Sequence, residues 1–82
     1  MANLDYDKMY SSAISLHAMY SVLVDELVNI KVNNSYLRHL EQVKDRISPE
    51  VYVSEKRRCK ESINLTKRSI DKQLYDIKQI KL

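Results

Sequence analysis

Apolar side chains recur along the first third of the chain with the spacing of an amphipathic helix. Steps of four and three residues alternate without interruption through Met9, Ala13, Leu16, Tyr20, Leu23, Leu27 and Ile30, which we call the predicted seam. Such a row lies on one side of an α-helix and is typical of a surface that packs against another helix. Asn3 or Asp5 is placed to cap the first turn of this helix.

The first helix carries more apolar side chains than the predicted seam contains. Tyr10, Ile14, Met19, Val22, Val24 and Val28 stand outside it, so apolar groups cover well over half of the helix circumference. Each large side chain left in water forgoes roughly 1.5 to 3 kcal/mol, and a small domain has little stability to spare. We therefore expect a second protein surface to cover this helix. The residues expected to make that contact are Met9, Tyr10, Leu16, Met19, Tyr20, Leu23, Leu27 and Ile30.

A second helix is predicted to begin at about residue 49. Ser48 is a favourable cap, Pro49 suits the first helical position, and Glu50 favours the positive end of a helix. No Gly or Pro follows. Apolar or small residues then recur mostly at steps of three and four, at Tyr52, Cys59, Ile63, Thr66, Ile70, Leu74 and Ile77. The pattern predicts a helix over about 49–80 with one narrow apolar stripe.

The end of the first helix is less sharply defined. Asn33, Asn34 and Ser35 interrupt the apolar pattern, which resumes on a shifted face at Leu37, Leu40, Val43 and Ile47. The pattern predicts a kink or a short turn at 33–35 and leaves open whether residues 4–47 form one bent helix or two. Because the break near 47–48 is short, the second helix must fold back beside the first. The predicted fold is a single all-α domain over 1–82, a hairpin of two long antiparallel helices.

Composition limits the class of protein further. The 82 residues include no Gly, and the single Cys59 cannot form an internal disulfide, so we expect neither a β fold nor an oxidising compartment. The uncharged run over 9–24 is shorter than the roughly 20 residues that span a bilayer. Asp5 and Asp7 also differ from the positive start of a secretory signal. These features predict a cytoplasmic protein without a membrane span.

The net charge of +3 is unevenly distributed, with five Lys/Arg and six Asp/Glu in 1–47 but nine and five in 48–82. The basic run of Lys56, Arg57, Arg58 and Lys60 could contact phosphates or an acidic protein. Pairs at i,i+4 would neutralise much of it along the helix; they are Arg57 with Glu61, Lys67 with Asp71, and Lys72 with Asp76. A solvated face is the main expectation, and nucleic acid is not expected to bind.

Residues that carry chemistry are sparse. His17 and His39 lie 22 residues apart without a carboxylate or Cys at a ligand spacing, so no metal site is predicted. Cys59 follows basic residues that can activate a thiol, but its place in the apolar stripe predicts a core position. The chain has neither a Gly-rich phosphate loop nor a Ser/His/Asp arrangement. We expect no enzymatic activity and no cofactor.

The segment Ile47-Ser48-Pro49-Glu50-Val51-Tyr52 and the helix after it, together with the over-apolar first helix, resemble the small YscE/SsaE-type co-chaperones of bacterial type III secretion. The resemblance concerns the order and character of the two helices, and residues 9–47 match the family less closely than the second helix does. It implies a helical hairpin that pairs with a repeat-type chaperone, the two keeping the needle subunit soluble in the cytosol before export. The net positive second helix departs from the more acidic members of that family, which leaves the orientation of the partner surface open.

Three functions follow from these features. The leading expectation is a non-catalytic cytosolic chaperone or adaptor that forms a hetero-oligomer with another chaperone or a secreted subunit through its first helix. One alternative is a small phage or mobile-element regulator that binds a host protein or nucleic acid through the basic second helix. The other is a homodimer in which two copies of the first helix form a four-helix bundle.

Overall fold

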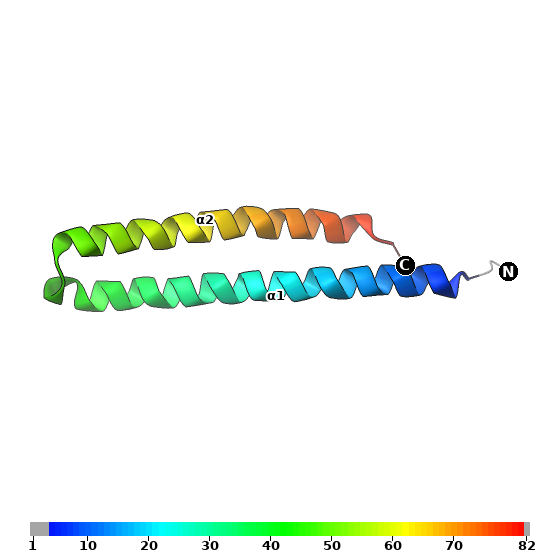
Figure 1. Ribbon diagram of the computed structural model, residues 1–82, viewed down its shortest axis with the longest axis horizontal. Coiled ribbons are helices and arrows are strands. Elements are labelled where there is room, and N and C mark those ends of the chain that lie inside the picture. Colours follow the sequence, from blue (N-terminus) through cyan, green and yellow to red (C-terminus); the bar gives the residue numbers. More distant parts are fainter. Residues whose placement is uncertain (1–3, 82) are drawn as a thin grey trace.

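The computed structural model describes residues 4–81, most of which lie in two long helices (Figure 1). Helix α1 spans Tyr6–Val43, the 3₁₀ turn η1 spans Lys44–Arg46, and helix α2 spans Pro49–Gln79. Figure 1 shows α1 and α2 side by side and antiparallel, in a rod 69 Å long and 15 Å wide. No strand occurs within the described residues. The predicted all-α helical hairpin is confirmed.

Each helix begins at a polar cap. The Asp5 carboxylate accepts a hydrogen bond from the backbone N–H of Lys8 at 3.0 Å, and the Ser48 hydroxyl accepts one from Val51 at 3.1 Å. These bonds satisfy N–H groups that a helix start otherwise leaves unpaired. Pro49 follows Ser48 at the first helical position, where its missing N–H is not needed. The predicted start of the second helix is confirmed; Asn3 lies outside the described residues.

Helix α1 passes through 33–35 without leaving the α-helical conformation. Of the two arrangements left open for residues 4–47, one bent helix or two, the structure shows one helix over 6–43 with no turn at 33–35. The Asn33 side-chain amide donates to the backbone carbonyl of Asn29 at 3.1 Å and to the Ser62 hydroxyl of α2 at 3.2 Å. Both bonds satisfy the amide without interrupting the helix, because the carbonyl oxygen of Asn29 has two lone pairs and can accept more than one hydrogen bond. The helix ends at Val43, where the chain tightens into η1.

The core between the two helices is thin. Leu40 of α1, together with Cys59 and Ile63 of α2, are the buried hydrophobic side chains of the described residues. The predicted core position of Cys59 is confirmed, because its side chain is fully buried. A small buried core implies that cooperative packing against α2 supplies only part of what stabilises α1.

The side of α1 that faces α2 is a mixed polar and apolar row. Its half-buried and buried members alternate steps of three and four, and we call them the inner row: Met9, Ser12, Leu16, Met19, Leu23, Glu26, Ile30, Asn33, Leu37 and Leu40. That period is the one by which helices pair in coiled coils. The inner row shares only part of the predicted seam, because Ala13, Tyr20 and Leu27 are exposed.

Polar bonds between the helices explain this difference. The Ser69 hydroxyl donates to Glu26 Oε1 at 2.5 Å, and the Thr66 hydroxyl donates to Asn29 Oδ1 at 3.2 Å. Since α2 presents small hydroxyl side chains along its stripe, α1 turns the polar Glu26 and Asn33 toward them, together with the apolar members of the inner row. The pairing gives the hydroxyls of Ser62, Thr66 and Ser69 hydrogen-bond partners on α1, which an apolar seam facing them would not do.

Glu26 is the weak point of the inner row, because its Oε2 is buried without a hydrogen-bond partner in the described structure. An unbonded buried oxygen costs about 1–3 kcal/mol. We expect Glu26→Leu to raise the thermal unfolding midpoint by several degrees, since an aliphatic group suits a position between paired helices. Glu26→Gln, which keeps the shape and the bond to Ser69, is expected to change it less. A lower midpoint for the leucine variant would show that the carboxylate stabilises the hairpin.

Candidate protein-binding surface

Exposed apolar side chains form a stripe along the side of α1 that α2 does not cover. Most of its members lie three or four residues from another member, and we call them the outer face of α1: Tyr6, Tyr10, Ala13, Ile14, Tyr20, Val24, Leu27 and Val28. The members larger than alanine are exposed by between 50% for Leu27 and 71% for Tyr6. The stripe has the helical period of a docking surface, and within residues 4–81 its members stay exposed.

The size of the outer face sets it apart from scattered surface residues. A tyrosine offers roughly 150–250 Å² for burial, and Tyr6, Tyr10 and Tyr20 are each at least half exposed. These three alone therefore present on the order of 300 Å², and the aliphatic members add to it. The largest apolar patch of a soluble monomer is about 300–600 Å², and patches of that size are frequently functional. The outer face thus has the size and composition of an interaction site.

The residues predicted to bind a partner divide between the two sides of α1. Tyr10, Tyr20 and Leu27 lie on the outer face and are exposed. The other five stand half-buried in the inner row; they are Met9, Leu16, Met19, Leu23 and Ile30.

The prediction did not include Ile14, Val24 and Val28, although they are among the exposed members of the outer face. Their steps of three and four from other apolar residues formed a second row that competed with the predicted seam. The sequence pattern places these residues outside the predicted seam, but it does not show which side of α1 faces α2.

A shallow hollow lies near the middle of the outer face. Its lining residues are His17, Tyr20, Ser21, Val24 and Asp25, all from α1. The first four occupy positions i, i+3, i+4 and i+7 of the helix, which are the four corners that receive one side chain of a facing helix in knobs-into-holes packing. The geometry of this part of α1 therefore suits a helix laid along it.

The N-terminal end of the outer face extends beyond α2. The bonds of Glu26 with Ser69 and of Asn33 with Ser62 fix the antiparallel register, which sets the last turn of α2 opposite the region of Leu16. Figure 1 shows the blue end of α1 projecting past the end of α2. Tyr6 and Tyr10 belong to this projecting part and are exposed by about 70%. A partner can approach them without contacting α2.

Two members of the basic run on α2 make ion pairs and cation–π contacts within the hairpin. The Lys56 ammonium lies 3.3 Å from Glu41 Oε1 of α1 and 5.3 Å from the centre of the Tyr52 ring. The Arg58 guanidinium bonds to Glu55 at 2.7 Å and lies 5.8 Å from the centre of the Tyr36 ring. These contacts combine ion pairing with cation–π attraction. Lys56 and Arg58 therefore contribute to holding the hairpin together.

The other two basic residues, Arg57 and Lys60, are exposed. Within residues 4–81 neither forms an ion pair, and the predicted pair of Arg57 with Glu61 is absent. The predicted ion pairs of Lys67 with Asp71 and of Lys72 with Asp76 also do not form within the described part of the chain. An ion pair between exposed side chains gains little free energy in water and must immobilise two long side chains. The i,i+4 spacing alone therefore did not predict which ion pairs form in this protein.

A hydrogen bond from the Tyr52 hydroxyl to Glu41, with Lys56 beside it, lowers the pKa of the Glu41 carboxyl below its ordinary 4.5. The same Tyr52 bond, followed by the bond to Glu41, raises the pKa of Lys56. A carboxyl with a lowered pKa in the folded state stabilises the fold above about pH 4.5, and this contribution is lost as the pH falls through the folded pKa.

We expect Tyr52→Phe to raise the pKa of Glu41 toward 4.5 while leaving it somewhat depressed by Lys56. Carbon-13 NMR titration of the glutamate carboxyls measures this directly. Tyr75→Phe is a matched control, because Tyr75 is exposed on the same helix. An unchanged Glu41 titration in Tyr52→Phe would contradict the assigned cause.

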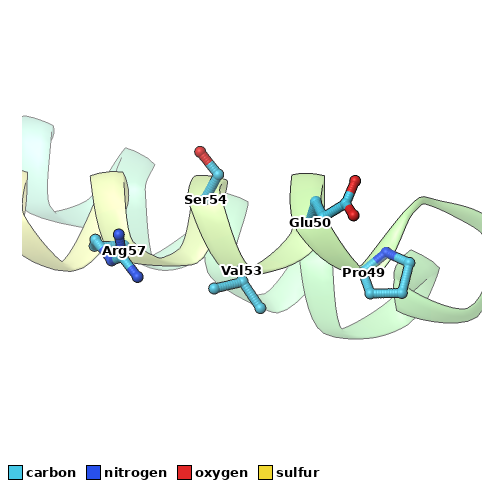
Figure 2. A pocket seen from close by; sticks show the side chains of 5 residues that line it. All are labelled: Pro49, Glu50, Val53, Ser54 and Arg57. Atoms are coloured by element: carbon cyan, nitrogen blue, oxygen red, sulfur yellow. The ribbon is translucent and has the colours of Figure 1, made fainter.

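A second hollow lies at the start of α2, lined by Pro49, Glu50, Val53, Ser54 and Arg57 (Figure 2). All five side chains are exposed and come from one helix, and Figure 2 shows them spread along its first turns rather than converging. Small-molecule sites bury most of the ligand, which this open surface does not. In residues 4–81 no group of three or more His, Cys, Asp or Glu side chains is arranged to hold a metal ion.

The helical stretch Tyr6–Arg46 is long and apolar enough to cross a membrane by length and composition, with a mean hydropathy of 1.2 over 18 residues, none of them buried. An exposed protein-binding helix has the same two properties. Helix α2 packs along this stretch and carries charged residues such as Lys67, Arg68 and Asp71. A bilayer would have to admit these charges or separate the helices, so a protein partner preserves the hairpin better than a membrane does.

Comparison with known proteins gives no match among protein families, curated proteins or solved structures. The functional inference rests on the side chains of the outer face.

Proposed function

We propose that this chain is a non-catalytic protein-binding module, a cytoplasmic chaperone or adaptor that covers an apolar surface of a partner protein with the outer face of α1. The observation that carries the proposal is the uncovered stripe itself, which includes Tyr10, Tyr20, Val24 and Leu27, each at least half exposed on one side of a single helix. Burying such a stripe in a groove of another protein supplies affinity through anchors spaced along the helix.

The thin core supports the same proposal. A domain whose buried hydrophobic side chains are Leu40, Cys59 and Ile63 gains stability from any partner that binds the folded state and not the unfolded one. At a partner concentration 100 times the Kd, this gain is about 2.7 kcal/mol. The hairpin would therefore be most stable inside a complex, as is common for small chains that function in assemblies.

The resemblance of residues 47–52 to the YscE/SsaE-type layout supports a narrower form of the proposal. The fold implied by that resemblance, a helical hairpin with a capped second helix at Ser48-Pro49, is the fold observed. In this form the partner is another chaperone or a secreted subunit, and covering its apolar surface blocks premature assembly. The exposed tyrosines suit such a surface, because a tyrosine combines an apolar ring with a hydroxyl that tolerates water.

The alternative function, a regulator that binds through basic α2, has less support. Lys56 and Arg58 make contacts within the hairpin, which leaves Arg57 and Lys60 as the members of the run that form no ion pair within residues 4–81. Two such cations neutralise few phosphates and give weak binding at physiological salt. The apolar stripe is the larger and more continuous feature.

Salt separates the two functions. The tagged chain is captured from its native cells, and the bound material is washed at 0.1 M and at 1 M NaCl, where the Debye length falls from about 10 Å to about 3 Å. We expect the same specific protein to remain at both concentrations, because an apolar interface depends little on screening. Release of the partner at 1 M NaCl would assign binding to α2, and recovery of no specific protein would reject the proposal.

A further inference from the structure

We propose that, when no other protein occupies it, the outer face of α1 pairs with the outer face of a second copy of this chain in antiparallel orientation. The inference rests on the proposed function in one respect, that this face is a docking surface. The new element is that a second copy of the chain can bind this face, with its α1 running antiparallel to the first. Self-pairing would cover the exposed stripe of each copy and leave each α2 on the outside of a four-helix assembly.

The positions of two charges favour a second copy in antiparallel orientation. Asp7 lies at the N-terminal end of the outer face and Lys31 lies 24 residues later, and both are exposed. Asp7 stands seven residues before Ile14, and Lys31 seven after Val24, so each shares the side of the helix occupied by that stripe member. Antiparallel pairing sets Asp7 opposite Lys31 of the second copy at both ends, whereas parallel pairing would oppose like charges.

The register fixed by these charges also matches the apolar residues. With Asp7 opposite Lys31, Tyr10 of one copy faces Val28 of the other, and Ile14 faces Val24. Each contact joins a larger side chain to a smaller β-branched one, as interdigitating helices require. Two-fold symmetry makes each contact occur twice.

The hollow of the outer face falls near the centre of this arrangement. In the same register His17 of the second copy stands opposite Ser21, one of the residues that line the hollow together with Tyr20 and Val24. The small serine side chain gives the opposing ring room to enter, in the manner of a knob in a hole. The charges, the apolar pairs and the hollow therefore select one register between two copies.

Self-pairing gives the surface a simple form of regulation. A partner that needs the outer face must compete with the second copy, so its apparent affinity falls in proportion to the fraction of free chains. The dimer also keeps the stripe out of water while no partner is present, which limits non-specific association.

Sedimentation equilibrium of the purified full chain tests the proposal. We expect the wild-type chain to show a reversible monomer–dimer equilibrium. Asp7→Lys and Lys31→Asp are each expected to weaken it by about 5- to 30-fold, because each creates two like-charge contacts per dimer. An equimolar mixture of the two variants restores opposite charges at both ends of a heterodimer, so it is expected to recover near-wild-type association. Asp45→Lys, a reversal in exposed η1, is the matched control and should have no such effect.

Three results of sedimentation would overturn the inference: a wild-type chain that stays monomeric at all concentrations, single variants that dimerise like wild type, or a mixture that associates no better than either variant alone. A fourth would come from flotation with phosphatidylcholine vesicles, in which a monomer that floats with the vesicles would show that lipid covers the outer face. Circular dichroism of each variant shows whether the hairpin is intact. Failure here is distinguishable from failure of the proposed function. If the wild-type chain is monomeric but Val24→Asp abolishes capture of the partner, the proposed function holds and the self-pairing does not. If the chain dimerises but Val24→Asp leaves capture of the partner unchanged, the self-pairing holds and the proposed function does not.

Discussion

Leu40→Ala is expected to lower the free energy of unfolding by about 2–5 kcal/mol, the usual cost of truncating a buried leucine. Leu40 is only 3% exposed and is the one buried hydrophobic residue that α1 contributes within the described part of the chain. Because Leu40, Cys59 and Ile63 are the buried hydrophobic side chains of the described residues, few apolar neighbours are available to fill the cavity that the truncation leaves. The loss is comparable to the whole stability of a small domain.

Urea denaturation followed by circular dichroism measures this effect in the purified chain. The matched control is Leu65→Ala, since Leu65 is 63% exposed on α2 and its truncation should change the stability by less than about 0.5 kcal/mol. If Leu40→Ala already reduces the helical signal without urea, the expected destabilisation is met. Equal urea midpoints for the two variants would mean that the thin core does not hold the hairpin together.

Val24→Asp is expected to weaken partner binding at least about 100-fold, because a carboxylate buried in an apolar interface without a counterion costs about 3–5 kcal/mol. The fold should tolerate the change, since Val24 is 57% exposed and is not one of the buried core residues. Binding is measured by isothermal titration with the captured partner, and folding by circular dichroism.

Val53→Asp provides the control for Val24→Asp. It introduces the same charge at a valine that is 51% exposed, but on α2. The proposal requires this variant to bind within a few-fold of wild type. If both variants bind equally well, the outer face of α1 is not the interface. If both bind poorly, the loss comes from the added charge and not from the position.

Local signals account for the parts of the fold that could be predicted from the sequence. The Ser48-Pro49-Glu50 start of α2 acts through its own backbone, and the absence of Gly over 82 residues leaves few ways to end a helix. The short connection then forces an antiparallel neighbour. The place of Cys59 in the apolar stripe predicts a core position, and the structure confirms it.

Pairing between distant residues accounts for the rest. Which side of α1 faces α2 depends on bonds such as Glu26 with Ser69, across 43 residues of sequence, and no periodicity of α1 alone contains that information. Apolar residues on nearly all sides of α1 made two rows equally consistent with a helical seam. The ion pair of Glu41 with Lys56 spans the hairpin in the same way, so counting i,i+4 pairs along one helix could not find it.

The apolar surplus of α1 was evident from the sequence, and the structure gives it a location. Most of it lies on the outer face, including a part near Tyr6 and Tyr10 where α2 has ended. An intramolecular core would have explained the surplus without any partner, but the inner row uses polar residues at several of its positions. The surplus is therefore available for intermolecular contact.

Site-specific photocrosslinking in the native cells tests the central claim most directly. A benzoylphenylalanine replaces Tyr20 on the outer face or Tyr75 on α2, two exposed tyrosines on different helices, and the crosslinked products are identified by mass spectrometry. The account predicts that Tyr20 gives a specific heteromeric product, with or without a product of twice the 9.7 kDa chain mass, and that Tyr75 gives neither. Specific crosslinks from Tyr75 and none from Tyr20 would contradict it.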